Sequence, residues 1–269
     1  MSVIDINHPP VVQFEGLKKQ FNVKGRPMTV IDDFSLSIHG GELVAIVGSS
    51  GCGKSTLLRM LVGLDNEYQG RILVDGQAVS GISRDRGIVF QEPRLFPWLT
   101  VRQNIALGLA REKRDKAARA RLVDHFIRLV HLDDFADVLP AQLSGGMAQR
   151  VAIARGLVAN PRILMLDEPF GALDALTRQQ MQQELRRIHQ TEGTTTLLVT
   201  HDVEEAVYLA DRVVVLAPRP GRILHIADLD QPHPRRRDGQ AFHQQCNALL
   251  ALLTRPATPA APESSSTTF

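Results

Sequence analysis

The sequence predicts an α/β protein with a mainly parallel β-sheet, an antiparallel β-subdomain at its N-terminus and an α-helical subdomain inserted in the middle. Short apolar, β-branched runs alternate with helical patterns on both sides of the middle, which is typical of a buried parallel sheet. Residues 11–38 instead alternate apolar with polar side chains. From about 92 to 160 a helical pattern prevails, which indicates the insertion.

The bulk composition limits the classes of function without choosing one. A chain of 269 residues suits one large domain with a substantial insertion. Its net charge of +2 argues against nucleic acid as a partner. Two cysteines, Cys52 and Cys246, cannot form a disulfide framework, so we expect a reducing, cytoplasmic setting. The N-terminus lacks the features of a secretory signal, and no run approaches the ~18 apolar residues of a spanning helix.

The chain divides into a domain and two ends. We expect an N-terminal extension over residues 1–10, the domain over 11–254, and a disordered, Pro/Ser/Thr-rich tail over 255–269. In the domain, residues 11–17 and 30–38 look like half-buried antiparallel strands joined by a polar loop that contains Gly25 and Pro27.

The segment from 44 to 61 carries the most informative motif. An apolar strand over 44–47 breaks into small residues and resumes as a helical pattern. The small residues fit G-x-x-x-x-G-K-[ST], in which glycines let backbone N–H groups surround a polyphosphate and the next helix points its positive end at the anion. This phosphate loop consists of Gly48, Ser49, Ser50, Gly51, Cys52, Gly53, Lys54, Ser55 and Thr56.

The phosphate loop predicts a nucleotide with Mg²⁺. Lys54 can reach the β- and γ-phosphates, and the Ser55 hydroxyl can hold the metal ion. Phe21 follows the first strand in polar surroundings. Its ring either belongs to the core or offers a face on which adenine stacks.

Further along, polar residues follow apolar strands. Residues 71–74 form a strand that enters an Asp75-Gly76 turn, and 87–90 form another that ends at Gln91. After a helix that Ser144 would cap, strands over 163–166, 195–200 and 213–216 alternate with helices over 176–190 and 203–209. The first two of these strands end in Asp167-Glu168 and His201.

These strand ends should meet the phosphate loop at one edge of the sheet, where ligands bind. Asp167 would hold Mg²⁺, and Glu168 would orient or deprotonate the water that attacks the γ-phosphate. His201 would contact the γ-phosphate, and Gln91 the Mg²⁺ or the attacking water.

The motifs together resemble a known family. Leu143-Ser144-Gly145-Gly146, with Gln149-Arg150, looks like the signature motif of ATP-binding cassette (ABC) ATPases, a branch of the P-loop NTPases. The resemblance covers roughly residues 11–225 in the family's order, including 171–174 as its D-loop, which ends in Asp174. Two departures are that Phe21 replaces the more usual tyrosine and that Met147 and Ala148 stand where many members carry polar residues.

The resemblance implies an assembly as well as a reaction. Two copies would clamp two ATP molecules head to tail, so that Ser144, Gly145 and Gly146 of one copy meet the γ-phosphate held by the other. ATP hydrolysis would drive two transmembrane permease subunits and, through them, a periplasmic or lipid-anchored solute-binding protein. The chain would then be peripheral, at the cytoplasmic face of the inner (cell) membrane.

The branch of the family is indicated by two loops. Residues 91–101 and 213–222 are similar to the nitrate/sulfonate/taurine importer group, within which the aliphatic sulfonate ATPases look closest, partly through residues 234–238. That basic run is equally explained by a solvated loop. Nitrate, taurine and a thiamine precursor are alternative solutes, and a soluble ABC ATPase of DNA repair or translation is an alternative class. Such soluble ATPases usually need two cassettes or a long coiled-coil insertion, which this sequence lacks.

One apolar loop is left to explain. Leu95, Phe96, Trp98 and Leu99 either pack locally under the helical subdomain or are covered by the membrane subunit.

Overall fold

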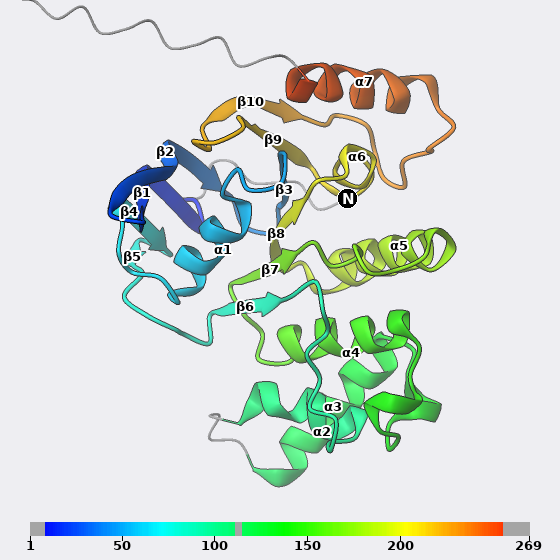
Figure 1. Cartoon of the computed structure of the whole chain (residues 1–269). Helices are drawn as coiled ribbons and strands as arrows, with labels where there is room; N and C mark the ends of the chain where they lie inside the picture. The colour runs from blue at the N-terminus through cyan, green and yellow to red at the C-terminus, as the bar shows by residue number, and fades with distance from the viewer. Residues whose placement is uncertain (1–8, 111–114, 255–269) are drawn as a thin grey trace, which may run out of the picture.

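A six-stranded sheet lies at the centre of the molecule (Figure 1). The computed structural model describes residues 9–110 and 115–254, so the expected disordered tail and most of the N-terminal extension lie outside the described residues. The neighbouring strands are parallel except for the β10–β9 pair, as the sequence predicts for the core. In sheet order they are β10 Ile223–Asp228, β9 Arg212–Leu216, β3 Leu43–Val47, β8 Thr195–Thr200, β7 Ile163–Asp167 and β6 Arg86–Val89.

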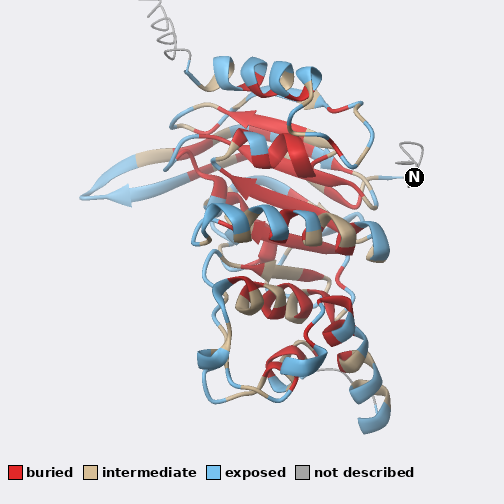
Figure 2. Ribbon diagram, turned by 90° about the vertical axis from the view of Figure 1, so that its right-hand side faces the viewer, coloured by how far each residue is buried: buried red, intermediate tan, exposed pale blue. Residues whose placement is uncertain are grey.

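The second sheet is the expected antiparallel subdomain. Its strands, in sheet order, are β2 Arg26–Ile38, β1 Val12–Val23, β4 Gln69–Val74 and β5 Gln77–Ala78. The prediction of a polar loop between the first two strands is wrong, because β1 and β2 continue as a hairpin up to a turn at Lys24-Gly25. Pro27 is tolerated inside β2 because β2 is an edge strand, where a missing N–H breaks no ladder. The tip of this hairpin is exposed (Figure 2).

Both faces of the central sheet are buried. Val44 and Ile46 of β3 join a hydrophobic cluster with the antiparallel sheet and α1 (Lys54–Val62). Leu43, Ala45 and Val47 join the cluster on the helical side. Since alternate residues of a strand point to opposite faces, burial on both sides explains why β3 reads as an unbroken apolar run.

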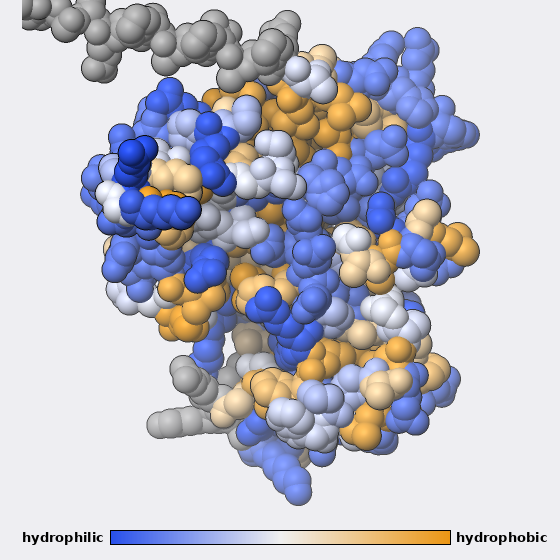
Figure 3. Space-filling model, in the orientation of Figure 1, coloured by the Kyte–Doolittle hydropathy of each residue, from blue (hydrophilic) through white to orange (hydrophobic). Residues whose placement is uncertain are grey.

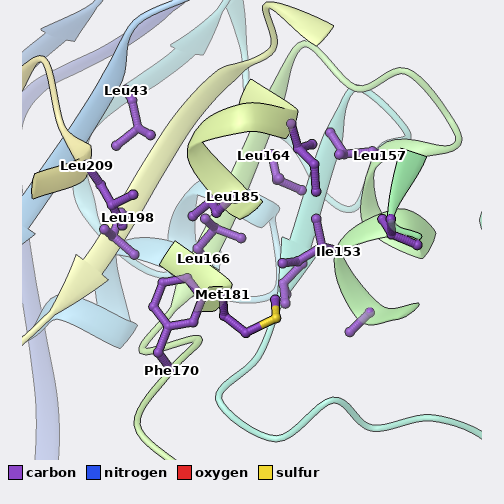
Figure 4. Packing of buried hydrophobic residues seen from close by; sticks show 14 of the residues in the cluster. Leu43, Ile153, Leu157, Leu164, Leu166, Phe170, Met181, Leu185, Leu198 and Leu209 are labelled. Atoms are coloured by element: carbon purple, nitrogen blue, oxygen red, sulfur yellow. The ribbon is translucent and has the colours of Figure 1, made fainter. Parts of the chain in front are cut away.

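Helices cover the second face of the sheet. They are α4 Gly145–Leu157, α5 Ala175–Glu192, α6 Val203–Leu209 and α7 Gln240–Thr254. Figure 4 shows Leu166 and Leu198 from β7 and β8 among Met181 and Leu185 from α5, with Phe170 closing one side. This packing fixes the positions of β7 and β8, which end at Asp167 and Thr200.

The helical subdomain lies between β6 and β7 in the chain and below the sheets in Figure 1. It contains α2 Val101–Ala106, α3 Lys116–Leu129 and α4, separated by the 3-10 turns Leu107–Leu109, Asp133–Phe135 and Pro140–Gln142. The helical pattern expected from about 92 to 160 is therefore interrupted. Apolar side chains gather on parts of its surface (Figure 3).

The C-terminal part adds β10 and α7, which the sequence analysis did not predict. The basic run before α7 is partly internal. Arg235 is buried and donates hydrogen bonds to the backbone oxygens of Val207, Ala210 and Leu229. The Arg237 guanidinium lies 4.0 Å from the centre of the Tyr208 ring. The interpretation of this run as a solvated loop is therefore wrong for Arg235, which is buried, although Arg236 is exposed.

None of the helices in the described ranges combines the length and apolar composition needed to cross a bilayer.

Candidate functional site

The phosphate loop connects β3 to α1 at the carboxyl edge of the central sheet. Gly53 stands just before α1 with a φ of 106°, a conformation that favours glycine. A Cβ on Gly53 would lie 2.4 Å from the Ile31 side chain, and one on Gly48 would lie 2.7 Å from the Cys52 sulfur. These close approaches leave no room for a side chain at Gly48 or Gly53, which explains why the motif has glycine at both positions. Burial raises the pKa of the Cys52 thiol.

Lys54 reaches back into this loop. Its side chain is only 5% exposed, and its Nζ donates hydrogen bonds to the backbone oxygens of Gly48 and Ser49 at 2.8 and 3.2 Å. The same Nζ lies 3.9 Å from Oε1 of Glu168. The ammonium group is therefore held between the phosphate loop and the end of β7.

Asp167 ends β7 beside the start of α1. Its Oδ1 accepts a hydrogen bond from the Ser55 hydroxyl at 3.0 Å. Burial raises the pKa of Asp167, while the Ser55 hydrogen bond opposes that shift. A hydroxyl and a carboxylate in contact are the hard oxygen donors that Mg²⁺ prefers, so these two residues fit a magnesium site.

Glu168 follows with an unusual backbone. Its φ is 46°, in the left-handed region, and its N–H donates to the Val199 oxygen at 2.9 Å. Its Oε2 lies 3.0 Å from Nδ1 of the exposed His201, the first residue after β8. His201 on one side and Lys54 on the other therefore orient the carboxylate.

Gln91 lies close to the same segment. A Cβ on Gly171 would stand 2.9 Å from Nε2 of Gln91 and 3.5 Å from the Glu168 backbone oxygen. The edge of the sheet thus brings together the phosphate loop, Asp167, Glu168 and His201, with Gln91 beside them. A carboxylate held by a histidine, next to a phosphate loop, is an arrangement suited to deprotonating a water molecule.

Phe21 lies near the tip of the β1–β2 hairpin, opposite Met28. Its ring is 39% exposed, and the Lys19 Nζ lies 4.8 Å from the ring centre. This exposed fraction excludes a fully buried core position for Phe21. A residue that the sequence analysis did not select, Arg219, contacts both Met28 and the phosphate loop.

The signature segment, residues 143–146, opens α4. The Ser144 hydroxyl accepts a hydrogen bond from the Met147 N–H at 3.2 Å and so caps the helix. A Cβ on Gly146 would lie 2.7 Å from Cγ2 of Thr177, and one on Gly145 would lie 3.3 Å from Leu173. Both glycines therefore allow α4 to approach the neighbouring segment and α5 closely.

Asp174 caps α5 in the same way. Its Oδ1 accepts from the N–H groups of Leu176 and Thr177 at 3.1 Å, and hydrogen bonding by Thr177 lowers its pKa. In the part of the chain that is described, the hydrogen bonds of Ser144 and Asp174 run to their own helices rather than to the phosphate loop. The structure therefore does not bring these two predicted residues to the cluster of Lys54, Asp167 and Glu168.

Comparisons with known proteins agree on one family. Residues 31–171 match the family model described as ABC transporter. The chain is 42% identical over 244 residues to the aliphatic sulfonates import ATP-binding protein SsuB of Bacillus cereus, which covers 91% of this chain and 96% of that protein. It is 49% identical over 227 residues to SsuB 1 of Xanthomonas axonopodis pv. citri, covering 83% and 90%.

A solved structure shares the fold. It is the dimeric, post-hydrolysis state of an ATP-binding cassette bound to ADP and Pi, with a TM-score of 0.70 and 31% identity over 82% of this chain and 100% of that chain.

Proposed function

Since this chain belongs to the ABC transporter family and is one of its ATPases, we propose that it is the energy-coupling subunit of a bacterial importer of aliphatic sulfonates. The observation that carries the solute assignment is the identity of 42 and 49% with two SsuB proteins over most of the chain. The domain boundaries at 11 and 254, with a helical subdomain over about 92–160, belong to this proposal.

The site supports binding of ATP. The backbone N–H groups of residues 48–56 would surround the phosphates, with Lys54 at the β- and γ-phosphates and the Phe21 ring against adenine. Glu168 would accept the proton of the attacking water, because its carboxylate is already oriented by His201. His201 would then contact the γ-phosphate, and Gln91 would contact the water.

Mg²⁺ fits the same site. The Ser55 hydroxyl and the Asp167 carboxylate, 3.0 Å apart, would hold it together with Gln91. When bound, the ion neutralises charge on the phosphate oxygens.

A second copy would complete the site. Two helix N-termini carry Ser144, Gly145, Gly146 and Asp174, and among the described residues the capping side chains accept hydrogen bonds from their own helices rather than from the phosphate loop. We infer a head-to-tail dimer, in which these residues meet the ATP held by the other copy. The dimeric state of the similar cassette supports this arrangement.

The membrane subunits would dock on the aromatic loop, residues 95–99. Phe96 and Trp98 are 44 and 70% exposed and contact each other edge to face, whereas Leu95 packs against the core. Buried Asn104 holds the loop backbone by donating to the oxygens of Phe96 and Leu99 and accepting from the Phe96 N–H. A loop with a fixed backbone and exposed aromatic rings suits an interface.

This docking would place the chain at the cytoplasmic face of the cell membrane, as a peripheral subunit. A periplasmic or lipid-anchored solute-binding protein would act on it only through the two permease subunits. We propose no nucleic-acid partner, in keeping with the net charge of +2.

The experiment combines assembly with growth. The chain should co-purify in detergent with the permease encoded beside its gene, and its deletion should abolish growth on an alkanesulfonate as sole sulfur source. Growth should return with the wild-type gene and not with Glu168→Gln. Co-purification with normal growth on alkanesulfonates would redirect the assignment to nitrate, taurine or a thiamine precursor. Absence of any membrane partner would favour a soluble ABC ATPase.

A further inference from the structure

The loop between β9 and β10, residues 217–222, is fixed to strand β2. The Gly221 N–H donates to the Val30 oxygen at 2.8 Å, and the Gly221 oxygen accepts from the Asp32 N–H at 3.1 Å. Arg222 of the same loop forms an ion pair with Asp32. The position of this loop is therefore set by backbone and side-chain contacts with the antiparallel sheet.

The same loop touches the phosphate loop from outside. Nε and Nη2 of Arg219 both donate to the Gly51 backbone oxygen, at 3.3 and 3.2 Å. Two residues after Arg219, a Cβ on Gly221 would lie 2.2 Å from the Cys52 backbone oxygen, so the two backbones are in direct contact there. Two successive carbonyl groups of the phosphate loop thus face residues 217–222.

The direction of these carbonyls matters for an anion. In a trans peptide the C=O and the next N–H point in opposite directions. The hydrogen bonds from Arg219 to the Gly51 oxygen therefore also fix the direction of the Cys52 N–H. That N–H donates to the Ser49 oxygen at 3.3 Å and closes the turn of the phosphate loop. Without Arg219, among the described residues only the 3.3 Å hydrogen bond to Ser49 would hold this peptide, next to a glycine whose backbone is conformationally permissive.

We propose that Arg219 is a positioning residue for the nucleotide, which holds the phosphate loop in its anion-binding shape. Its Nη1 also donates to the Met28 sulfur at 3.2 Å, and Met28 pairs with Phe21 across the hairpin. The guanidinium therefore joins the phosphate subsite to the strands that carry the aromatic face. The inference rests on the proposed function, because it requires that residues 48–56 bind ATP.

The test measures nucleotide affinity of the full chain with Arg219→Ala and Arg219→Lys. Arg219→Ala should weaken ATP, ADP and inorganic tripolyphosphate each by about tenfold, the scale of a lost pair of hydrogen bonds. The equal loss follows because all three ligands share the phosphate loop. Lysine, which donates from a single ammonium group, should restore part of the affinity. At saturating ATP kcat should stay within about twofold, so that the effect appears in KM.

Two control variants make the result decisive. Arg222→Ala removes the Asp32 ion pair but keeps the two backbone hydrogen bonds of Gly221 that position the loop, and Arg236→Ala removes an exposed pair with Asp238. Both variants should therefore keep wild-type affinity. Equal losses in Arg219→Ala and Arg222→Ala, or unchanged affinity with a lowered Tm in Arg219→Ala, would show a merely structural role and overturn the inference. A wild-type chain that bound no ATP would instead refute the proposed function.

Discussion

The phosphate loop and the signature segment both lead into a helix N-terminus, yet their backbone donors are used differently. At α1 the N-cap is Gly53, which offers no side chain, and Lys54, Asp167 and Glu168 converge around the loop. At α4 the Ser144 hydroxyl already accepts from the Met147 N–H. An uncapped helix end leaves all of its first N–H groups for an anion, whereas at α4 one of them is already used by Ser144.

This difference separates two tasks. The groups suited to proton transfer and metal binding, Glu168 and Asp167, lie beside the phosphate loop of one chain. The signature segment contributes none of them. We therefore expect variants of the first region to change the chemical step or the affinity, and variants of the second to change assembly.

The largest effect should come from Glu168→Gln. The amide keeps the shape of the side chain but is a poor base, so turnover should fall by at least about 100-fold while ATP binding persists. A phosphate-release assay and a fluorescent nucleotide measure the two quantities. Lys54→Ala is the matched contrast, because it should lose ATP affinity itself. Turnover of Glu168→Gln at the wild-type rate would remove Glu168 from the proposed role.

Ser144→Arg should have the next largest effect, and it tests the role of the signature segment in assembly. The bulky cation would stand where the signature segment meets the second copy's nucleotide, so we expect normal monomer folding and ATP binding, no ATP-dependent dimer and little hydrolysis. Sizing chromatography with ATP is the measurement. Ser144→Thr, which keeps a capping hydroxyl, should behave as wild type. An ordinary dimer in Ser144→Arg would contradict head-to-tail assembly.

Changing Phe96 and Trp98 to serine should affect neither region directly. Their rings are exposed and the loop backbone is held by Asn104, so the ATPase activity of the isolated chain should stay near normal. Co-purification with the permease, and transport, should fail. Phe135→Ser, an exposed aromatic elsewhere in the helical subdomain, is the control. Unfolding of the double variant would show that these rings belong to the chain's own core.

The last prediction concerns the stability of the fold rather than its activity, at Glu205 in the helix that follows His201. Burial raises the pKa of Glu205 in α6 to about 8. Between the ordinary pKa of 4.5 and about 8 the folded state holds one more proton than the unfolded state, so stability falls as pH rises through this window. Glu205→Gln should match the wild type near pH 4.5 and exceed it by on the order of 5 kcal/mol above pH 8.

Urea unfolding at the two pH values tests this expectation. Glu204→Gln, at the exposed neighbouring position, should leave the pH dependence unchanged. If Glu205→Gln gained no stability at the higher pH, the buried carboxyl would not be the titrating group.

The central sheet was predictable because its strands are buried on both faces. Val44 and Ile46 pack toward the antiparallel sheet while Leu43, Ala45 and Val47 pack toward the helices, which leaves an unbroken apolar run in the sequence. The parallel order then placed Asp167, Glu168 and His201 at the edge of the phosphate loop. For these residues, local pattern and global fold point the same way.

Other features depend on contacts that no local pattern records. β10 is largely exposed and has no clean alternation of apolar residues. Arg219 lies 168 positions from Gly51, whose oxygen it binds, and its loop alone gives no sign of that contact. In the sequence, Arg235 looks like part of a solvated basic run. In the structure, its guanidinium donates hydrogen bonds to buried backbone oxygens. Each of these roles appears only when distant segments meet.

At Glu168 the backbone conformation and the proposed chemistry favour different residue types. For a residue with a side chain this conformation costs on the order of 1 kcal/mol, which glycine would avoid. A glycine there would relieve this backbone cost but would also remove the carboxylate that faces His201. The residue type that best suits the backbone at position 168 therefore lacks the carboxylate that we propose as the base.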